Sequence, residues 1–170
     1  KLNMSKIIGI DLGTTFSGIA QLDDLGNPEV LSSTDTNKKI TASAVYIKEK
    51  NVVVGDKALD ALIATPKNVV TETKRQMEND VVFSIQKGEW IDKEEANEGC
   101  YSPAQISSFI LGKLKGYTAD VKKAVITVPA LFAEKARVAT LDAAKMAGIE
   151  VIELINEPTA AACYYASLPA

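Results

Sequence analysis

The 170-residue chain contains no histidine and only two cysteines, Cys100 and Cys163, which lie far apart in the sequence. Histidines and paired cysteines are the usual ligands of zinc, so a soft-metal site is not expected. Two isolated thiols also provide no disulfide framework, and free cysteines fit a reducing compartment. These absences lead us to expect a cytoplasmic protein without cross-links.

Long apolar runs and an excess of basic charge are missing too. Apolar residues form 46% and charged residues 24% of the chain, and no apolar run approaches the roughly 20 residues of a membrane span. The net charge of −3, without basic runs interleaved with aromatics, argues against nucleic-acid binding. We expect a soluble chain of one domain's size that binds neither membranes nor nucleic acids, preceded at residues 1–5 by a short leader or an expression remnant.

The N-terminal segment combines a strand, an acidic residue, a glycine turn and two adjacent hydroxyls. Residues 7–10 suit a buried strand that ends at Asp11, and Gly13 lets the backbone turn so that amides and the hydroxyls of Thr14 and Thr15 face an anion. The run Phe16–Leu22 would pair back as a hairpin. The pattern indicates a phosphate clamp, with an ordinary polar-tipped hairpin as the alternative, and it differs from a P-loop because no Gly-Lys-Ser/Thr follows.

The first third of the chain is rich in expected strands, which turn residues such as Gly26-Asn27-Pro28 separate. These strands cover 7–11, Phe16–Leu22, 29–31, 44–47 and Asn51–Val54. Helices are then expected at 57–64 and 68–77, followed by a strand-like segment at 81–86 and an acidic loop at 92–98.

The last third alternates between helices and strands. Ser102 and Pro103 suit the N-cap and first position of a helix with one apolar stripe. The expected elements beyond it are a strand at 124–128, a helix at Glu134–Met146 ended by Gly148, a strand at 150–154 and a helix at 158–166. This βαβα order requires parallel strands under helical cover and predicts an α/β fold.

A second motif stands near the C-terminus: Ile155-Asn156-Glu157-Pro158-Thr159-Ala160-Ala161-Ala162. Pro158 suits the first turn of a helix, which places Glu157 at a strand-to-helix junction. Together with the phosphate-clamp segment and Val128-Pro129-Ala130-Leu131-Phe132, this motif resembles the nucleotide-binding domain of the seventy-kilodalton heat-shock chaperones, whose bacterial type is DnaK. The resemblance is collinear and runs from about Lys6 to the C-terminus.

The resemblance implies an actin-like ATPase fold with a ribonuclease-H-like motif, in which a mixed five-stranded sheet is flanked by helices. It implies a core subdomain at about 6–39 and 98–170 and a smaller inserted subdomain at about 40–97. It also implies that the intact protein binds ATP with Mg²⁺ and hydrolyses it to ADP. Nucleotide state would then control its grip on unfolded polypeptides, with the help of a J-domain co-chaperone and a nucleotide-exchange factor.

Phosphoryl transfer to water needs donors on the phosphates, carboxylates that hold Mg²⁺ directly or through water, and a cation or base at the attacking water. The residues that match the first phosphate loop of the family are Gly13, Thr14, Thr15 and Phe16. By the same resemblance, Asp11 and Glu157 would orient the water shell of Mg²⁺, and Lys74 would face the γ-phosphate and the attacking water.

Each of these roles has a structural alternative. Lys74 alone would suit a solvated helix lysine, and Asp11 and Glu157 would suit caps or turn formers, although a carboxylate that ends a buried strand is costly without a partner. Pro129 and Arg137 match the proline and arginine that relay nucleotide state in the family. They would otherwise be a strand-ending proline and an exposed helix arginine.

The chain departs from the family pattern at Glu153, where a basic residue that contributes to J-domain docking is common, so docking by the usual surface is in doubt. The second phosphate loop, Asp-Leu-Gly-Gly-Gly-Thr, is not among the 170 residues, and neither are the second lobe and the substrate-binding domain. The leading hypothesis is an N-terminal fragment, lobe I, that carries half of an ATP site, is inactive alone and self-associates. A complete small actin-like or sugar-kinase-like relative and a non-catalytic interaction module are the alternatives.

Overall fold

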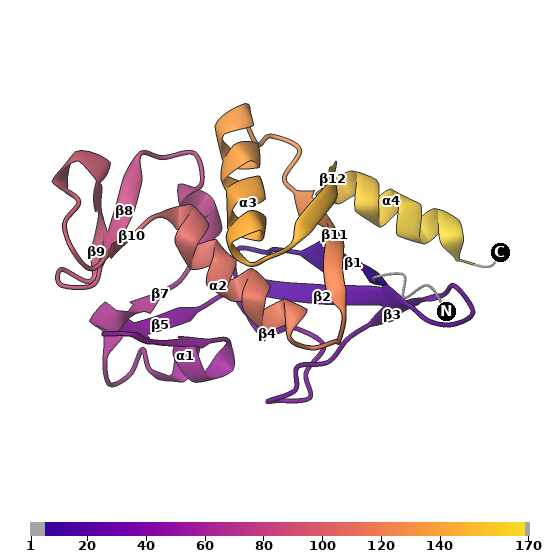
Figure 1. The fold of residues 1–170 in the computed structure, drawn as a ribbon, viewed down its shortest axis with the longest axis horizontal. Helices are drawn as coiled ribbons and strands as arrows, with labels where there is room; N and C mark the ends of the chain where they lie inside the picture. The colour runs from indigo at the N-terminus through magenta and orange to yellow at the C-terminus, as the bar shows by residue number, and fades with distance from the viewer. Residues whose placement is uncertain (1–5, 169–170) are drawn as a thin grey trace.

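A mixed β-sheet forms the centre of the molecule in the computed structural model, which describes residues 6–168 (Figure 1). The strand order is β12-β11-β1-β2-β3, and the short β4 pairs with β2 as an addition to the five strands expected. Strands β1, β11 and β12 are parallel, whereas β2 is antiparallel to its neighbours. The strand bounds are β1 Lys6–Asp11, β2 Phe16–Leu22, β3 Pro28–Val30, β4 Thr41–Ala42, β11 Val121–Val128 and β12 Glu150–Asn156.

Helices α2 (Pro103–Lys115) and α3 (Glu134–Met146) cover one face of this sheet. Helix α2 begins with a capping box, in which the Ser102 hydroxyl accepts from the Gln105 amide and the Gln105 side chain accepts from the Ser102 amide. Helix α3 ends where predicted, at Gly148 with φ +67°. The core consists of aliphatic side chains from the sheet and both helices, including Ile8, Ile10, Ile126, Ile106, Ile110, Leu111, Leu114, Ala143 and Ala144.

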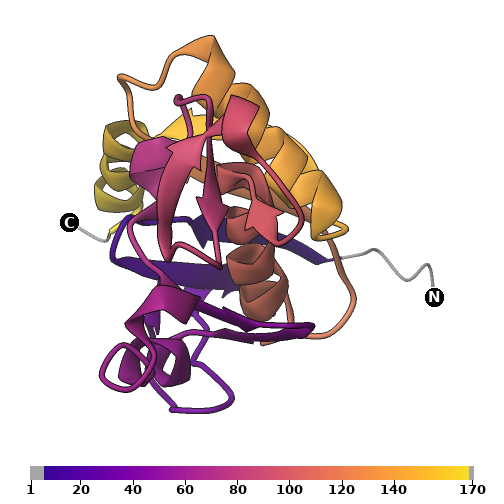
Figure 2. The same cartoon turned by 90° about the vertical axis from the view of Figure 1, so that its left-hand side faces the viewer.

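Helix α4 (Glu157–Ser167) lies on the opposite side of the sheet from α3 (Figure 2). The structure describes this helix in full, and none of its residues is buried. A cavity of about 300 Å³ separates it from the sheet and is lined by small and apolar residues such as Gly9, Gly18, Val125 and Ala160. The position of helix α4 therefore depends more on its connection to β12 than on the packing of its side chains against the sheet.

Two three-stranded sheets stand at the end of the molecule that is remote from α4 (Figures 1 and 2). One has the order β6-β5-β7 and the other β10-β8-β9. Their elements are β5 Val45–Lys48, β6 Asn51–Val54, α1 Asp56–Asp60, β7 Val69–Val70, β8 Val81–Ser84, β9 Glu89–Asp92 and β10 Cys100–Tyr101. Because β4 joins the central sheet and β10 pairs with β8, the division at about 40 and 97 stays a prediction.

The helix predicted at 68–77 is wrong. Its first part is β7, which pairs with β5, and its second part is the 3₁₀ helix η2 (Thr73–Gln76). The β-branched Val69 and Val70 suit a strand, and Glu72 has a left-handed φ of +53°, which an α-helix does not accommodate.

Smaller corrections concern the neighbouring segments. The α-helix expected at 57–64 ends at Asp60, and the short 3₁₀ helix η1 (Pro66–Asn68) precedes β7. The acidic loop expected at 92–98 contains the 3₁₀ helix η3 (Lys93–Glu95). The leader expected at 1–5 lies outside the described residues.

Candidate functional site

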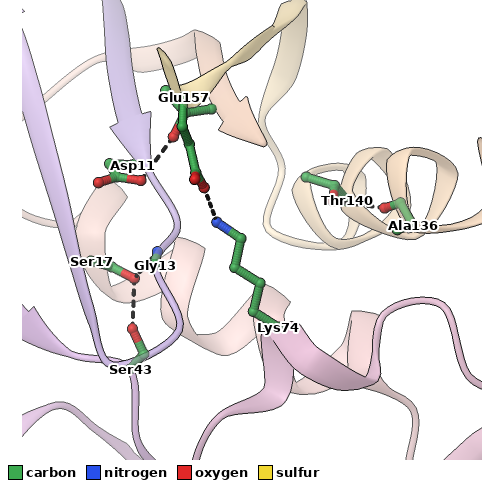
Figure 3. Close-up of polar contacts among 9 residues, drawn as sticks. Asp11, Gly13, Ser17, Ser43, Lys74, Ala136, Thr140 and Glu157 are labelled. Atoms are coloured by element: carbon green, nitrogen blue, oxygen red, sulfur yellow. Dashed lines mark hydrogen bonds and ion pairs between the residues drawn. The ribbon is translucent and has the colours of Figure 1, made fainter. Parts of the chain in front are cut away.

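The loop between β1 and β2 makes the tight turn that the sequence predicts. The Gly13 amide donates to Ser17 Oγ at 3.1 Å, and Ser17 Oγ lies 2.8 Å from Ser43 Oγ (Figure 3). A β-carbon on Gly13 would lie 1.9 Å from the carbonyl oxygen of Phe16, so a side chain does not fit at this position. The buried Ser17 and Ser43 hold the base of the loop in place.

Thr14 and Thr15 follow at the tip of this loop. Together with Ser43, Thr71 and Glu72 they line a cavity of about 250 Å³. Hydroxyl groups therefore predominate among the polar side chains around this space, and Thr15 is exposed at its rim. The hydroxyls of Thr14 and Thr15 suit an approaching anion. The rest of the wall is largely apolar and is formed by Phe16, Ala42, Ala44, Leu59 and Leu62.

Asp11 ends β1 at the carboxyl edge of the parallel strands. Its Oδ1 accepts a hydrogen bond from Thr127 Oγ1 at 2.8 Å. The strand register pairs Asp11 with Thr127 and Thr127 with Ile155, two residues before Glu157. The parallel strands therefore bring Asp11 and Glu157 to one edge of the sheet, where open α/β sheets commonly bind ligands.

Lys74 is buried, with 9% of its surface exposed, and its ammonium pairs with the Glu157 carboxylate (Figure 3). Its Nζ also lies 5.9 Å from the centroid of the Phe132 ring. The Glu157 side chain remains 40% exposed, so this ion pair borders solvent. The alternative of a solvated helix lysine does not describe this side chain.

Arg137 binds two segments that flank the site. Its Nε donates to the Phe132 carbonyl at 3.2 Å, and its Nη2 donates to Asn156 Oδ1 at 2.8 Å. Pro129 begins the turn that leads from β11 to this carbonyl, and its own carbonyl accepts from the Phe132 amide at 3.1 Å. The half-buried Arg137 thus connects the 129–132 turn to the residue before Glu157.

Besides Ser17 and Ser43 at the base of the loop, three residues that contact the predicted site residues were not predicted: Asn156, Thr127 and Phe132. Asn156 was signalled by its place beside Glu157 in the motif, and Thr127 by its position at the end of the strand next to β1. For Phe132 the aromatic contact with Lys74 depends on a tertiary approach of η2 that no local pattern indicates.

Comparison with known proteins settles the family. The family model described as Hsp70 protein matches residues 7–167. The chain belongs to the Hsp70 family. Its similarity to Hsp70 relatives is high: the chaperone protein DnaK of Nitrosopumilus maritimus is 41% identical over 169 residues, covering 93% of this chain and 24% of that protein.

Two further DnaK relatives match this Hsp70 chain at similar levels. DnaK of Carsonella ruddii is 40% identical over 184 residues, which cover 95% of this chain and 30% of the relative. DnaK of Thermotoga petrophila is 38% identical over 164 residues, which cover 94% and 26%. This Hsp70 chain therefore spans between 24% and 30% of the length of these curated relatives.

Membership of the Hsp70 family confirms the actin-like ATPase fold predicted from the sequence. Within residues 6–168, no helix has both the length and the apolar character needed to cross a bilayer. The same part of the chain contains no group of three or more His, Cys, Asp or Glu side chains that could hold a metal ion.

Proposed function

We propose that this chain forms lobe I of the nucleotide-binding domain of a DnaK-type chaperone and contributes half of an ATP·Mg²⁺ site. The observation that carries this proposal is the burial of Lys74 against Glu157, at the sheet edge that also holds Asp11 and the 13–16 loop. A lysine is rarely buried unless it is paired, because desolvating the ammonium is costly. A buried lysine next to an expected phosphate-binding loop suits an anion-binding site better than a purely structural role.

The side chains at this edge fit a nucleotide with magnesium. The collision that a β-carbon on Gly13 would cause shows how closely the loop backbone folds, and Thr14 and Thr15 offer hydroxyls to the phosphates. Bound Mg²⁺ would neutralise charge on the β- and γ-phosphates while keeping several of its waters. Asp11 and Glu157 would accept hydrogen bonds from those waters, which requires no direct carboxylate cluster.

Lys74 and the relay residues have separate tasks in this proposal. The Lys74 ammonium would stabilise the charge that develops on the γ-phosphate and would orient the attacking water. Pro129 and Arg137 would transmit the nucleotide state outward, because Arg137 is bonded both to the 129–132 turn and to Asn156. Any displacement of Glu157 and the adjacent Asn156 would therefore be transmitted through Arg137 to the N-terminus of α3.

We propose the partners of the intact protein from its relatives, which are named chaperones. These partners are unfolded polypeptides, a J-domain co-chaperone and a nucleotide-exchange factor, all in the cytoplasm. Glu153 is exposed on β12, so an acidic residue stands on the surface where we expect J-domain docking, and docking there should be weak. A non-catalytic module that pairs through its exposed face remains the alternative function.

The proposal is tested by a chimaera in which this chain replaces the matching segment of Thermotoga petrophila DnaK, which supplies the remainder of the site. Lys74→Ala should lower the rate of ATP hydrolysis by about 10² to 10³, as for other donors aimed at transition-state charge. The dissociation constant for ATP should change by less than about threefold, because the proposed contact strengthens only in the transition state. Equal losses in rate and affinity would make Lys74 a ground-state binding residue.

The isolated chain gives a second test. We expect negligible steady-state ATP turnover, because it has one of the two phosphate loops and each missing donor costs roughly 2.7–4 kcal/mol of transition-state stabilisation in comparable sites. Turnover by the purified chain at the rate of the chimaera would show that the second lobe is dispensable and would refute the half-site proposal.

A further inference from the structure

The segment that carries Lys74 is bound to α3 at a point outside the proposed nucleotide site. Glu78, four residues after Lys74, accepts a hydrogen bond through Oε1 from the Ala133 amide at 2.9 Å. Ala133 is the N-cap residue of α3, and its methyl side chain supplies no capping oxygen. Glu78, 55 positions away in the sequence, accepts from the amide of the N-cap residue itself, which in a capping box is bonded by the side chain at the third helical position.

This hydrogen bond closes a ring of contacts around the site. Lys74 pairs with Glu157, and the preceding residue, Asn156, accepts from Arg137. Arg137 also donates to the carbonyl of Phe132, which directly precedes Ala133. The ring runs through Lys74, Glu157, Asn156, Arg137, Phe132, Ala133 and Glu78. Glu78 thus adds a hydrogen-bonded link between the segment after η2 and the N-terminus of α3, besides the Lys74–Glu157 ion pair and the contact of Lys74 with the Phe132 ring.

We propose that Glu78 is a positioning residue, whose carboxylate holds the η2 segment against the N-terminus of α3 so that the Lys74 ammonium meets Glu157. The inference rests on the proposed function only in assigning Lys74 to a nucleotide site. Glu78 is exposed, so its side chain can be substituted without disturbing the hydrophobic core. Residues joined in one network generally show measurable energetic coupling, which makes the ring testable without nucleotide.

A competing anchor lies one residue earlier. Met77 is 3% exposed, and the Ser107 hydroxyl of α2 lies 3.6 Å from its sulfur. If Met77 alone held η2, removal of the Glu78 carboxylate would leave the Lys74–Glu157 interaction unchanged. The salt bridge of Asp80 to Lys135, at 2.7 Å, is a weaker candidate because both side chains are at least half exposed.

The test is a double-mutant cycle on the 170-residue chain, in which Lys74→Met and Glu157→Gln are made singly and together and their unfolding constants are measured by denaturant titration. The coupling between Lys74 and Glu157 should be at least about fivefold in the wild-type background, which corresponds to about 1 kcal/mol or more. In a Glu78→Ala background the coupling ratio should fall to one within experimental error, which means that Lys74 and Glu157 no longer interact. Glu78→Gln, which keeps an acceptor oxygen, should restore most of it.

A compensating variant separates positioning from helix capping. Ala133→Asp gives α3 its own capping carboxylate, because Ala133 already has the extended backbone of an N-cap. In the Glu78→Ala background, Ala133→Asp should recover stability but leave the Lys74–Glu157 coupling lost. Recovery of both would show that Glu78 only caps α3 and would overturn the proposal.

Glu134→Gln is the matched control, since it removes one negative charge from the first turn of α3 without touching the Ala133 amide. It should leave the coupling at its wild-type value. Unchanged coupling in Glu78→Ala would refute positioning by Glu78 in favour of Met77. Neither result depends on nucleotide, so a failure here is distinguishable from a failure of the ATP-site proposal.

Discussion

Helices α2 and α4 are both largely apolar and both have proline in the first turn, yet the molecule uses them differently. Helix α2 has a capping box and buries six residues, among them Ile106, Ile110 and Leu111. Helix α4 is described over its whole length and buries none, and it faces the sheet across a cavity of about 300 Å³. An apolar sequence therefore does not by itself show that a helix belongs to the core of this chain.

The two helices are held in place by different interactions. Side-chain burial places α2, whereas α4 is fixed at its first residues, where Glu157 meets Lys74 and Asn156 meets Arg137. The candidate site thus doubles as the attachment point of α4. A change in the site should move α4 more easily than it moves α2.

Truncating one side chain in each helix should affect stability very differently. Leu111→Ala, at a fully buried position in α2, should lower the free energy of unfolding by about 2–5 kcal/mol. Tyr165→Ala, at a position 74% exposed in α4, should change it by less than about 0.5 kcal/mol. Guanidinium titrations measure both, and similar losses at the two positions would mean that α4 packs as α2 does.

The attachment of α4 can be tested at the ion pair. Glu157→Gln removes the charged partner of a buried ammonium and should cost about 1–3 kcal/mol, less than a fully buried pair because Glu157 is 40% exposed. Adding Lys74→Met should recover most of that loss, since it removes the unpaired charge. Thermal unfolding of the three variants measures this, and an undiminished loss in the double variant would contradict the buried-charge explanation.

The exposed surface of α4 leads to the next prediction. Tyr164, Tyr165 and Leu168 are 54%, 74% and 46% exposed, so we expect concentration-dependent self-association through this helix. Tyr165→Ser with Leu168→Ser should weaken it, whereas Leu25→Ser, in the turn between β2 and β3, should not. Sedimentation over a wide concentration range measures the effect, and a monomer at every concentration would show that this surface is left unpaired.

The smallest expected effect on stability is at the ion pair between Lys113 of α2 and Asp35. Lys113 donates to Asp35 at 2.7 Å and holds the pKa of that exposed carboxyl below its usual value. The ionised form thus contributes stability above the usual pKa, and this is lost as the pH falls through the lowered pKa. Asp35→Asn should therefore lower the Tm slightly near pH 6, and the difference from wild type should vanish as the pH falls through the lowered pKa of Asp35. A difference that persists in acid would exclude this ion pair as its cause.

Much of this fold was predictable because local patterns and tertiary structure agree. Ser102 and Pro103 mark the start of α2, Gly148 marks the end of α3, and both lie where the sequence places them. The segment at 68–77 was not predictable in the same way. Its apolar spacing suits a helix, but Val69 and Val70 find partners on β5 and Glu72 turns the backbone.

Likewise, only part of the candidate site was predictable from the sequence. The strand end at Asp11 and the strand-to-helix junction at Glu157 follow from local pattern, and parallel pairing brings them to one edge. The burial of Lys74, its contact with Phe132 and the bond from Ala133 to Glu78 arise from segments more than 50 residues apart. Such approaches depend on how η2 packs against α2 and α3, which periodicity does not encode.

We propose above all that this sheet edge holds the phosphates of ATP. A crystal structure of the DnaK chimaera with Mg²⁺ and a non-hydrolysable ATP analogue tests it most directly. We predict the amides of the Gly13 to Phe16 loop against the phosphates, Asp11 and Glu157 contacting Mg²⁺ through water, and the Lys74 ammonium turned to the γ-phosphate. A nucleotide bound away from this loop, or Lys74 still paired only with Glu157 beside a bound nucleotide, would contradict it.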